Sequence, residues 1–88
     1  MFTVKIKRKA LKKLEKASSK QKKDIKDVIL ILKNDPIPFK KTDICKLKGY
    51  DNTYRIRTTG NQRIVYEVLW KEKTILIHYA GARKKAYE

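Results

Sequence analysis

Residues 46–66 read KLKGYDNTYRIRTTGNQRIVY, and this stretch decides the fold. It contains two runs in which apolar and polar residues alternate, Tyr54–Thr58 and Arg63–Tyr66, with the polar residues 59–62 between them. Alternation with period two on both sides of a short turn that contains Gly and Asn is typical of a β-hairpin. The stretch therefore predicts two antiparallel strands at the centre of the domain.

Three arginines of this hairpin fall on one face. Side chains two apart on a strand share a face, so Arg55 and Arg57 point the same way, and Arg63 returns beside them on the next strand. A guanidinium is a fixed fork of donors that matches phosphate geometry and keeps its proton at any physiological pH. The hairpin thus predicts a rigid cationic surface suited to a polyanion, although a solvated strand face is the simpler interpretation of charge alone.

The rest of the chain places helices before this hairpin and one more strand after it. A change from period two to apolar residues at i, i+4 and i+7 follows the first seven residues and indicates amphipathic helices. Ser18 and Gln21 fit a capping box at the start of the second helix. The expected elements are a strand over 2–7, helices over 8–17 and 20–33, an irregular loop over 36–45, the hairpin continued to residue 70, and a last strand over 74–80. This order, β-α-α-β-β-β, predicts an α+β fold in which a helical hairpin packs on one face of a mostly antiparallel sheet, as a single small domain over residues 1–88.

Net charge points to an acidic partner. The 88 residues carry 24 Lys and Arg against 9 Asp and Glu, a formal net charge of +15. Nucleic acid is the first candidate partner, and an acidic protein or an anionic membrane are the alternatives. The single cysteine, Cys45, excludes an internal disulfide and suits a reducing compartment; we expect it to be a small buried apolar residue. No secretion signal and no apolar run of about 18 residues are seen, so we expect a cytoplasmic protein that does not enter a membrane.

Four short motifs, in this order and spacing, resemble the RelE/ParE superfamily of toxins from prokaryotic toxin–antitoxin pairs. They are KLKG at 46–49, YRIR at 54–57, QRIVYEV at 62–68 and GARKKAY at 81–87. The resemblance implies a RelE-type mRNA interferase, a ribosome-dependent endoribonuclease that cuts mRNA in the A site and inhibits translation. In that family the ribose 2′-hydroxyl attacks the adjacent phosphodiester, with no metal or cofactor. It further implies an acidic RelB-like antitoxin that holds the toxin inactive in a hetero-oligomer.

The resemblance also implies a site. By position, the family's catalytic residues fall on Arg57, Arg63, Arg83 and Tyr87. The residues expected to bind the RNA are Arg55, Lys46, Lys48, Lys84 and Lys85. Such a reaction needs a base, positive charge around the phosphorane and an acid for the leaving oxygen. Arg57 stands where RelE-type members often carry lysine, and an arginine cannot serve as the base. That leaves Tyr87 as the base, or a mechanism that rests on electrostatics and substrate orientation.

Two other functions stay open on the same fold. A ParE-like inhibitor of DNA gyrase would bind a protein and leave RNA uncut, and the cluster of arginines argues against it. A catalytically silent relative would bind RNA or the ribosome with steep salt dependence and no cleavage. His78, on the last strand, is expected to be half-buried or paired across strands rather than catalytic.

Overall fold

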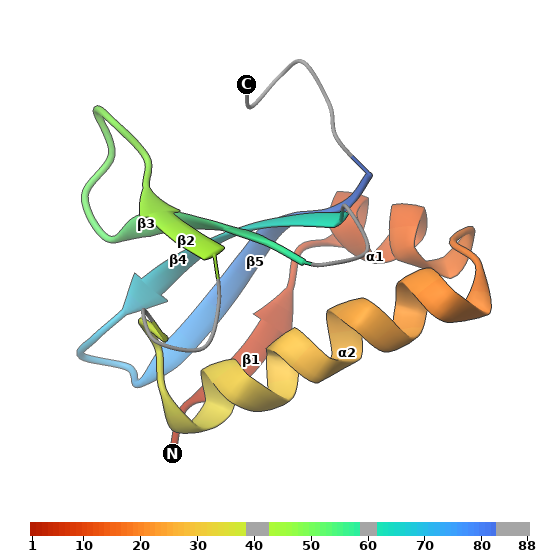
Figure 1. The fold of residues 1–88 in the computed structure, drawn as a ribbon. Coiled ribbons are helices and arrows are strands. Elements are labelled where there is room, and N and C mark those ends of the chain that lie inside the picture. Colours follow the sequence, from red (N-terminus) through yellow and green to blue (C-terminus); the bar gives the residue numbers. More distant parts are fainter. Residues whose placement is uncertain (39–42, 59–61, 83–88) are drawn as a thin grey trace.

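The computed structural model describes residues 1–38, 43–58 and 62–82. Its elements are β1 (Thr3–Ile6), α1 (Arg8–Glu15), α2 (Ser19–Asn34), β2 (Asp43–Lys46), β3 (Thr53–Arg57), β4 (Gln62–Leu69) and β5 (Thr74–Ala82). The strands form one sheet in the order β1-β5-β4-β3-β2, in which β1 runs parallel to β5 and every other pair is antiparallel. The long helix α2 lies under this sheet (Figure 1), which confirms the predicted α+β class with helices on one face.

Strand β2 corrects the predicted element order. The sequence predicted an irregular loop over 36–45, but Asp43–Lys46 pairs with β3 at the edge of the sheet. Only Ile44 of this strand packs against the core. A four-residue edge strand with one inward apolar side chain carries too little alternation to be recognised. The same geometry exposes Cys45, so the prediction of a buried cysteine was wrong.

The core lies between α2 and the lower face of the sheet. Ile25, Val28 and Leu32 of α2 are buried, at the spacing that puts them on one stripe of a helix. They meet the inward side chains of the strands, which are Tyr54, Ile56, Ile64, Tyr66, Val68, Ile75, Ile77 and Ala80. The start of α2 is fixed by the predicted capping box, in which Gln21 N donates to Ser18 Oγ and Ser18 N donates to Gln21 Oε1.

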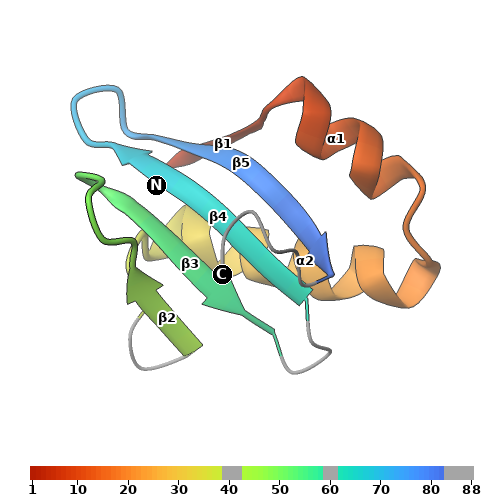
Figure 2. The same cartoon turned by 90° about the horizontal axis from the view of Figure 1, so that it is seen from above.

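The opposite face of the sheet is free of helices. Figure 2 looks onto this open face, with α2 behind the strands and α1 beside β5. β1 pairs with β5 only over residues 74–77, and α1 packs against β5 as well. The pairing of β4 with β5 shifts register between Val65 and Tyr66, which leaves His78 as an extra residue on β5. Within the described part of the chain, no helix is both long and apolar enough to cross a bilayer.

Candidate functional site

The three hairpin arginines lie together on the open face. Arg57 of β3 is the direct cross-strand partner of Arg63 of β4, and Arg63 is in turn the partner of Gly81 on β5. Directly paired residues of an antiparallel sheet project from the same face. Arg55 precedes Arg57 by two residues and so shares that face. The shared face predicted from the period-two pattern is therefore present.

The three guanidinium groups differ in their surroundings. Arg63 is only 6% exposed. The side chain of Arg57 is 41% exposed, and its Nε lies 3.9 Å from Asp43 Oδ2. An exposed ion pair at that distance contributes at most about 1 kcal/mol, so it does not hold the Arg57 side chain in one position against Asp43. The Nε of Arg55 is buried and has no hydrogen-bond partner among the described residues. The packed sheet thus holds Arg63 in place, while Arg57 keeps the freedom of a surface side chain.

The other predicted site residues fall elsewhere. Lys46 pairs with Tyr54, which places it on the core side of edge strand β2, opposite to the arginines. Lys48 is exposed in the turn that follows β2. Arg83, Lys84, Lys85 and Tyr87 lie outside the described residues.

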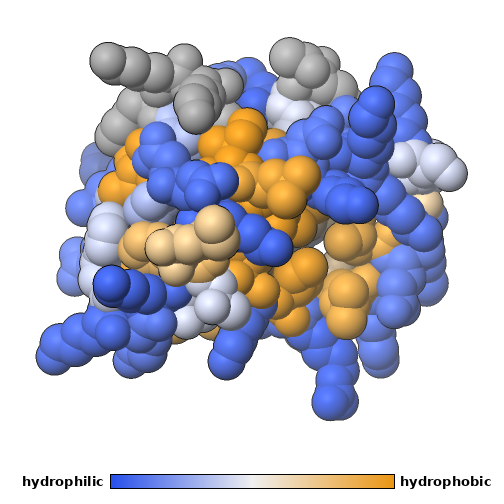
Figure 3. Space-filling model, turned by 90° about the horizontal axis from the view of Figure 1, so that it is seen from below, coloured by the Kyte–Doolittle hydropathy of each residue, from blue (hydrophilic) through white to orange (hydrophobic). Residues whose placement is uncertain are grey.

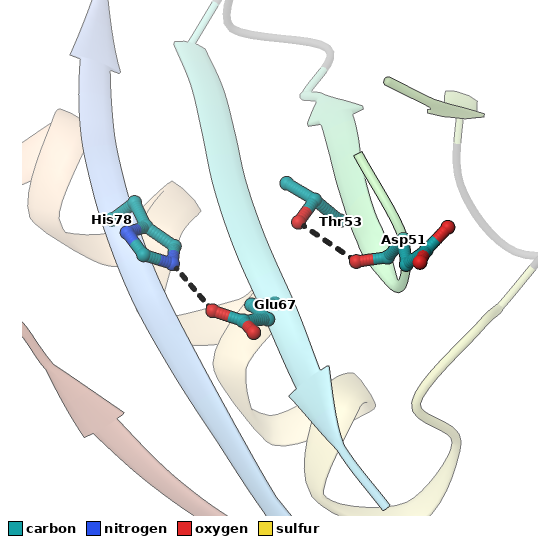
Figure 4. Close-up of polar contacts among 4 residues, drawn as sticks. All are labelled: Asp51, Thr53, Glu67 and His78. Carbon is teal, nitrogen blue, oxygen red and sulfur yellow. Dashed lines mark hydrogen bonds and ion pairs between the residues drawn. The ribbon is translucent and has the colours of Figure 1, made fainter. Parts of the chain in front are cut away.

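A pocket of about 310 Å³ occupies the far end of the open face. Its lining residues are Leu47, Tyr50, Asp51, Thr53, Val65, Glu67 and His78. His78 Nε2 lies 3.0 Å from Glu67 Oε1 (Figure 4), which confirms the predicted cross-strand pairing of this histidine. Thr53 Oγ1 donates to the backbone carbonyl of Asp51 on the other side of the pocket. Sequence reasoning did not find this pocket, because the Glu67–His78 contact depends on the register shift between β4 and β5.

The open face is consequently polarised along the strands. Arg57 and Arg63 stand at one end of the β3–β4 pair, whereas Thr53 and Glu67 form the pair at the other end. Four residues of strand separate the two ends by about 13 Å. A phosphate is attracted to the first end and repelled by the carboxylates of the second. The arrangement therefore favours a polyanion that contacts the arginine end.

One further basic residue reaches the arginine end from a helix. Lys13 of α1 donates a hydrogen bond from Nζ to the hydroxyl of Tyr79 on β5 over 2.7 Å. Lys13 and Tyr79 are 66 positions apart in the chain. No sequence signal identifies such a pair; it follows only from how α1 packs beside β5.

The helical side of the molecule is chemically different. Figure 3 shows apolar surface framed by hydrophilic side chains on that side. A groove of about 350 Å³ lies there, lined by apolar residues of α1 and α2 with Glu15, Lys22 and Lys26 at its border. Its apolar residues are Leu11, Leu14, Ile25 and Ile29. Among the described residues, no group of three or more His, Cys, Asp or Glu side chains could hold a metal ion.

Comparison with known proteins finds relatives that are RelE toxins or complexes of RelE with RelB. No family model matches the chain. It is 40% identical over 87 residues, covering 99% of this chain and 96% of the relative, to the protein named "Putative toxin RelE1" from Methanocaldococcus jannaschii. Its fold matches the archaeal RelE–RelB complex from Pyrococcus horikoshii with a TM-score of 0.81 and 31% identity, over 96% of this chain and 97% of that one. The RelB–RelE antitoxin–toxin complex from Methanococcus jannaschii matches with a TM-score of 0.73 and 35% identity, over 93% of each chain.

Proposed function

The chain belongs to the RelE family of toxins, and from this premise we propose that it is a ribosome-dependent endoribonuclease that cuts mRNA and thereby inhibits translation. The observation that carries the proposal is the row of Arg57 and Arg63 on the open face, with Arg55 next to it. Arg63 is a phosphate ligand held in place by the packed sheet, and Arg57 is a ligand that can adjust at the surface. The acidic end of the same face limits where an RNA chain can lie.

The proposed reaction is transfer within the RNA chain. The ribose 2′-oxygen attacks the adjacent phosphorus, and a phosphorane with two negative charges forms. Expulsion of the 5′-oxygen then leaves a cyclic phosphate and a free 5′-hydroxyl. Arg63 stabilises the growing charge by donating to the non-bridging oxygens, and it acts from a site largely shielded from water, where such contacts are strongest. Arg57 and Arg55 hold the neighbouring backbone in line.

Proton transfer requires a different group, because the arginines keep their protons. We assign to Tyr87 the removal of the proton from the 2′-hydroxyl, while the departing 5′-oxygen takes its proton from water; Arg83 is a further phosphate ligand. Lys48, Lys84 and Lys85 contribute contacts to RNA phosphates. Lys46 projects from the opposite face of β2 and contributes only its charge. A phenol has an ordinary pKa of about 10, and surrounding positive charge favours its ionised form. The proposed mechanism uses no metal ion.

We further propose that the protein acts in the cytoplasm and pairs with an acidic RelB-like antitoxin. Two relatives of known structure are RelE–RelB complexes. A formal net charge of +15 gives the free toxin a strong attraction for an acidic polypeptide as well as for RNA. The antitoxin then inhibits by covering the cationic row that the RNA needs.

The test uses purified protein and ribosomes programmed with a defined mRNA. We expect cleavage within the A-site codon, products that end in a cyclic phosphate and a 5′-hydroxyl, and no cleavage when the nucleotide before the cut carries a 2′-deoxyribose. Cleavage of that deoxy substrate excludes attack by the 2′-oxygen. Absence of any cleavage, with gyrase-dependent DNA breaks instead, indicates the ParE-like activity.

A further inference from the structure

Lys13 does not behave like the other lysines of α1. Its Nζ donates to the Tyr79 hydroxyl over 2.7 Å and lies 4.4 Å from the centroid of the Tyr79 ring. Lysines on an amphipathic helix usually extend into water, and fixing one costs side-chain entropy. Here a hydrogen bond and a cation–π contact offset that cost. Lys13 has no carboxylate within ion-pair distance among the described residues, so its charge is not neutralised there.

Gly81 makes the room that Lys13 occupies. A Cβ atom placed on Gly81 would lie 3.0 Å from Cε of Lys13, closer than ordinary packing allows. Gly81 also has a φ of +154°, which a residue with a side chain rarely adopts. The lysine stem therefore fills the position that a side chain at residue 81 would take.

The sheet register puts this position next to the arginines. Gly81 is the direct partner of Arg63, and Arg63 is the direct partner of Arg57. Neighbouring strands are about 4.8 Å apart, and direct partners project from one face. Lys13 over β5, Arg63 on β4 and Arg57 on β3 consequently form one row of three cations across the open face.

We propose that Lys13 is an additional phosphate ligand of this site, supplied by α1, and that Tyr79 is its positioning residue. The inference rests on the proposed RNA cleavage and extends its site. The ammonium donates a hydrogen bond to a non-bridging oxygen of the phosphodiester that Arg63 binds. Its charge stabilises that of the phosphorane, and the proton transfer stays with Tyr87. Gly81 keeps the path of the lysine stem open.

The test compares Lys13→Met with Lys12→Met in single-turnover cleavage on programmed ribosomes. Methionine keeps the apolar stem over Tyr79 and removes the charge together with the hydrogen bond to the Tyr79 hydroxyl. Lys12 is the adjacent, exposed residue of the same helix, so its variant matches the change in net charge. We expect a loss of at least tenfold for Lys13→Met and less than twofold for Lys12→Met. Equal losses for the two variants, or a normal rate for Lys13→Met, would overturn the proposal.

Two further readouts separate a phosphate contact from a structural role. The first readout is binding of an RNA oligonucleotide with a 2′-deoxyribose before the cut, measured at several salt concentrations. Lys13→Met should reduce the slope of log K against log salt by about 0.7, the value for one phosphate on a single strand. An unchanged slope contradicts the contact. Tyr79→Phe should lower the cleavage rate of the wild type but not that of Lys13→Met, whereas additive losses would show that Tyr79 does not act through Lys13.

The same design separates failure of the inference from failure of the proposed function. If the wild type cuts no RNA, the proposed activity is wrong. The salt slope then decides by itself whether Lys13 contacts a phosphate. If the wild type cuts RNA and Lys13→Met matches it in both rate and slope, only the role of Lys13 is wrong.

Discussion

Replacing Arg63 by alanine should be far more damaging than replacing Arg57. Arg63 is 6% exposed, whereas the side chain of Arg57 is 41% exposed. Hydrogen bonds to charged groups contribute about 1.5–3 kcal/mol each. Because Nε and Nη1 of Arg63 are buried, we expect one such bond from Arg63 to the phosphate. Loss of about 1.5–3 kcal/mol of transition-state stabilisation lowers the cleavage rate by roughly 10–150-fold. For Arg57, water and salt screen the charge, so we expect a loss of about 1 kcal/mol, or roughly fivefold.

The assay is single-turnover cleavage on programmed ribosomes at saturating protein. Arg63→Lys serves as the matched control, since it keeps the charge and loses the fork, and its rate should fall between those of the wild type and Arg63→Ala. Thermal unfolding of each variant verifies that the compared proteins are folded. A loss for Arg57→Ala equal to or larger than that for Arg63→Ala would refute the argument from burial, and an active Arg63→Ala variant would remove Arg63 from the site.

Three further predictions concern stability. Leu32→Ala, at a position that is 0% exposed, should lower the free energy of unfolding by about 2–5 kcal/mol in a denaturant titration, and a loss below about 1 kcal/mol would contradict its place in the core. Ser18→Ala removes the cap that accepts from Gln21 N and should cost about 1 kcal/mol, or roughly 4–8 °C in Tm, while Ser19→Ala leaves Tm nearly unchanged. Burial raises the pKa of Tyr66, whose hydroxyl donates to the Pro36 carbonyl over 2.7 Å. The phenol of Tyr66 ionises near pH 10 in the unfolded chain and resists ionisation in the folded one. The stability gained by burying the neutral Tyr66 hydroxyl is therefore complete at neutral pH and falls above about pH 10. Tyr66→Phe should be less stable than the wild type at pH 7 and lose less stability between pH 9 and pH 11; parallel losses in the two proteins would contradict the shift.

The sequence predicted those parts of the molecule that follow from local periodicity. Strand alternation placed Arg55, Arg57 and Arg63 on one face. Helical spacing indicated that the segment of α2 is an amphipathic helix, and the structure buries Ile25, Val28 and Leu32 of its apolar stripe. Both patterns repeat within a few residues, so they need no knowledge of what the element packs against.

Features set by contacts between distant segments were not predictable. β2 was missed because Ile44 is its one apolar residue packed against the core, so its pairing with β3 is visible only in the assembled sheet. The neighbourhood of Lys13 depends on how α1 packs beside β5, and that of Glu67 depends on a register shift. None of these contacts produces a periodic pattern in the sequence of the residues that form it. The sequence therefore predicted the two strand residues of the cationic row, Arg57 and Arg63, but not its helical residue, Lys13.

The most direct test of the central claim is a map of mRNA 5′ ends after induction of the protein in cells that lack an antitoxin. We predict cuts inside translated codons, in phase with the reading frame, that disappear with Arg63→Ala while the variant protein remains folded and present. Growth arrest with intact mRNA, or cuts that persist in Arg63→Ala, would contradict the claim that the arginine row cleaves RNA.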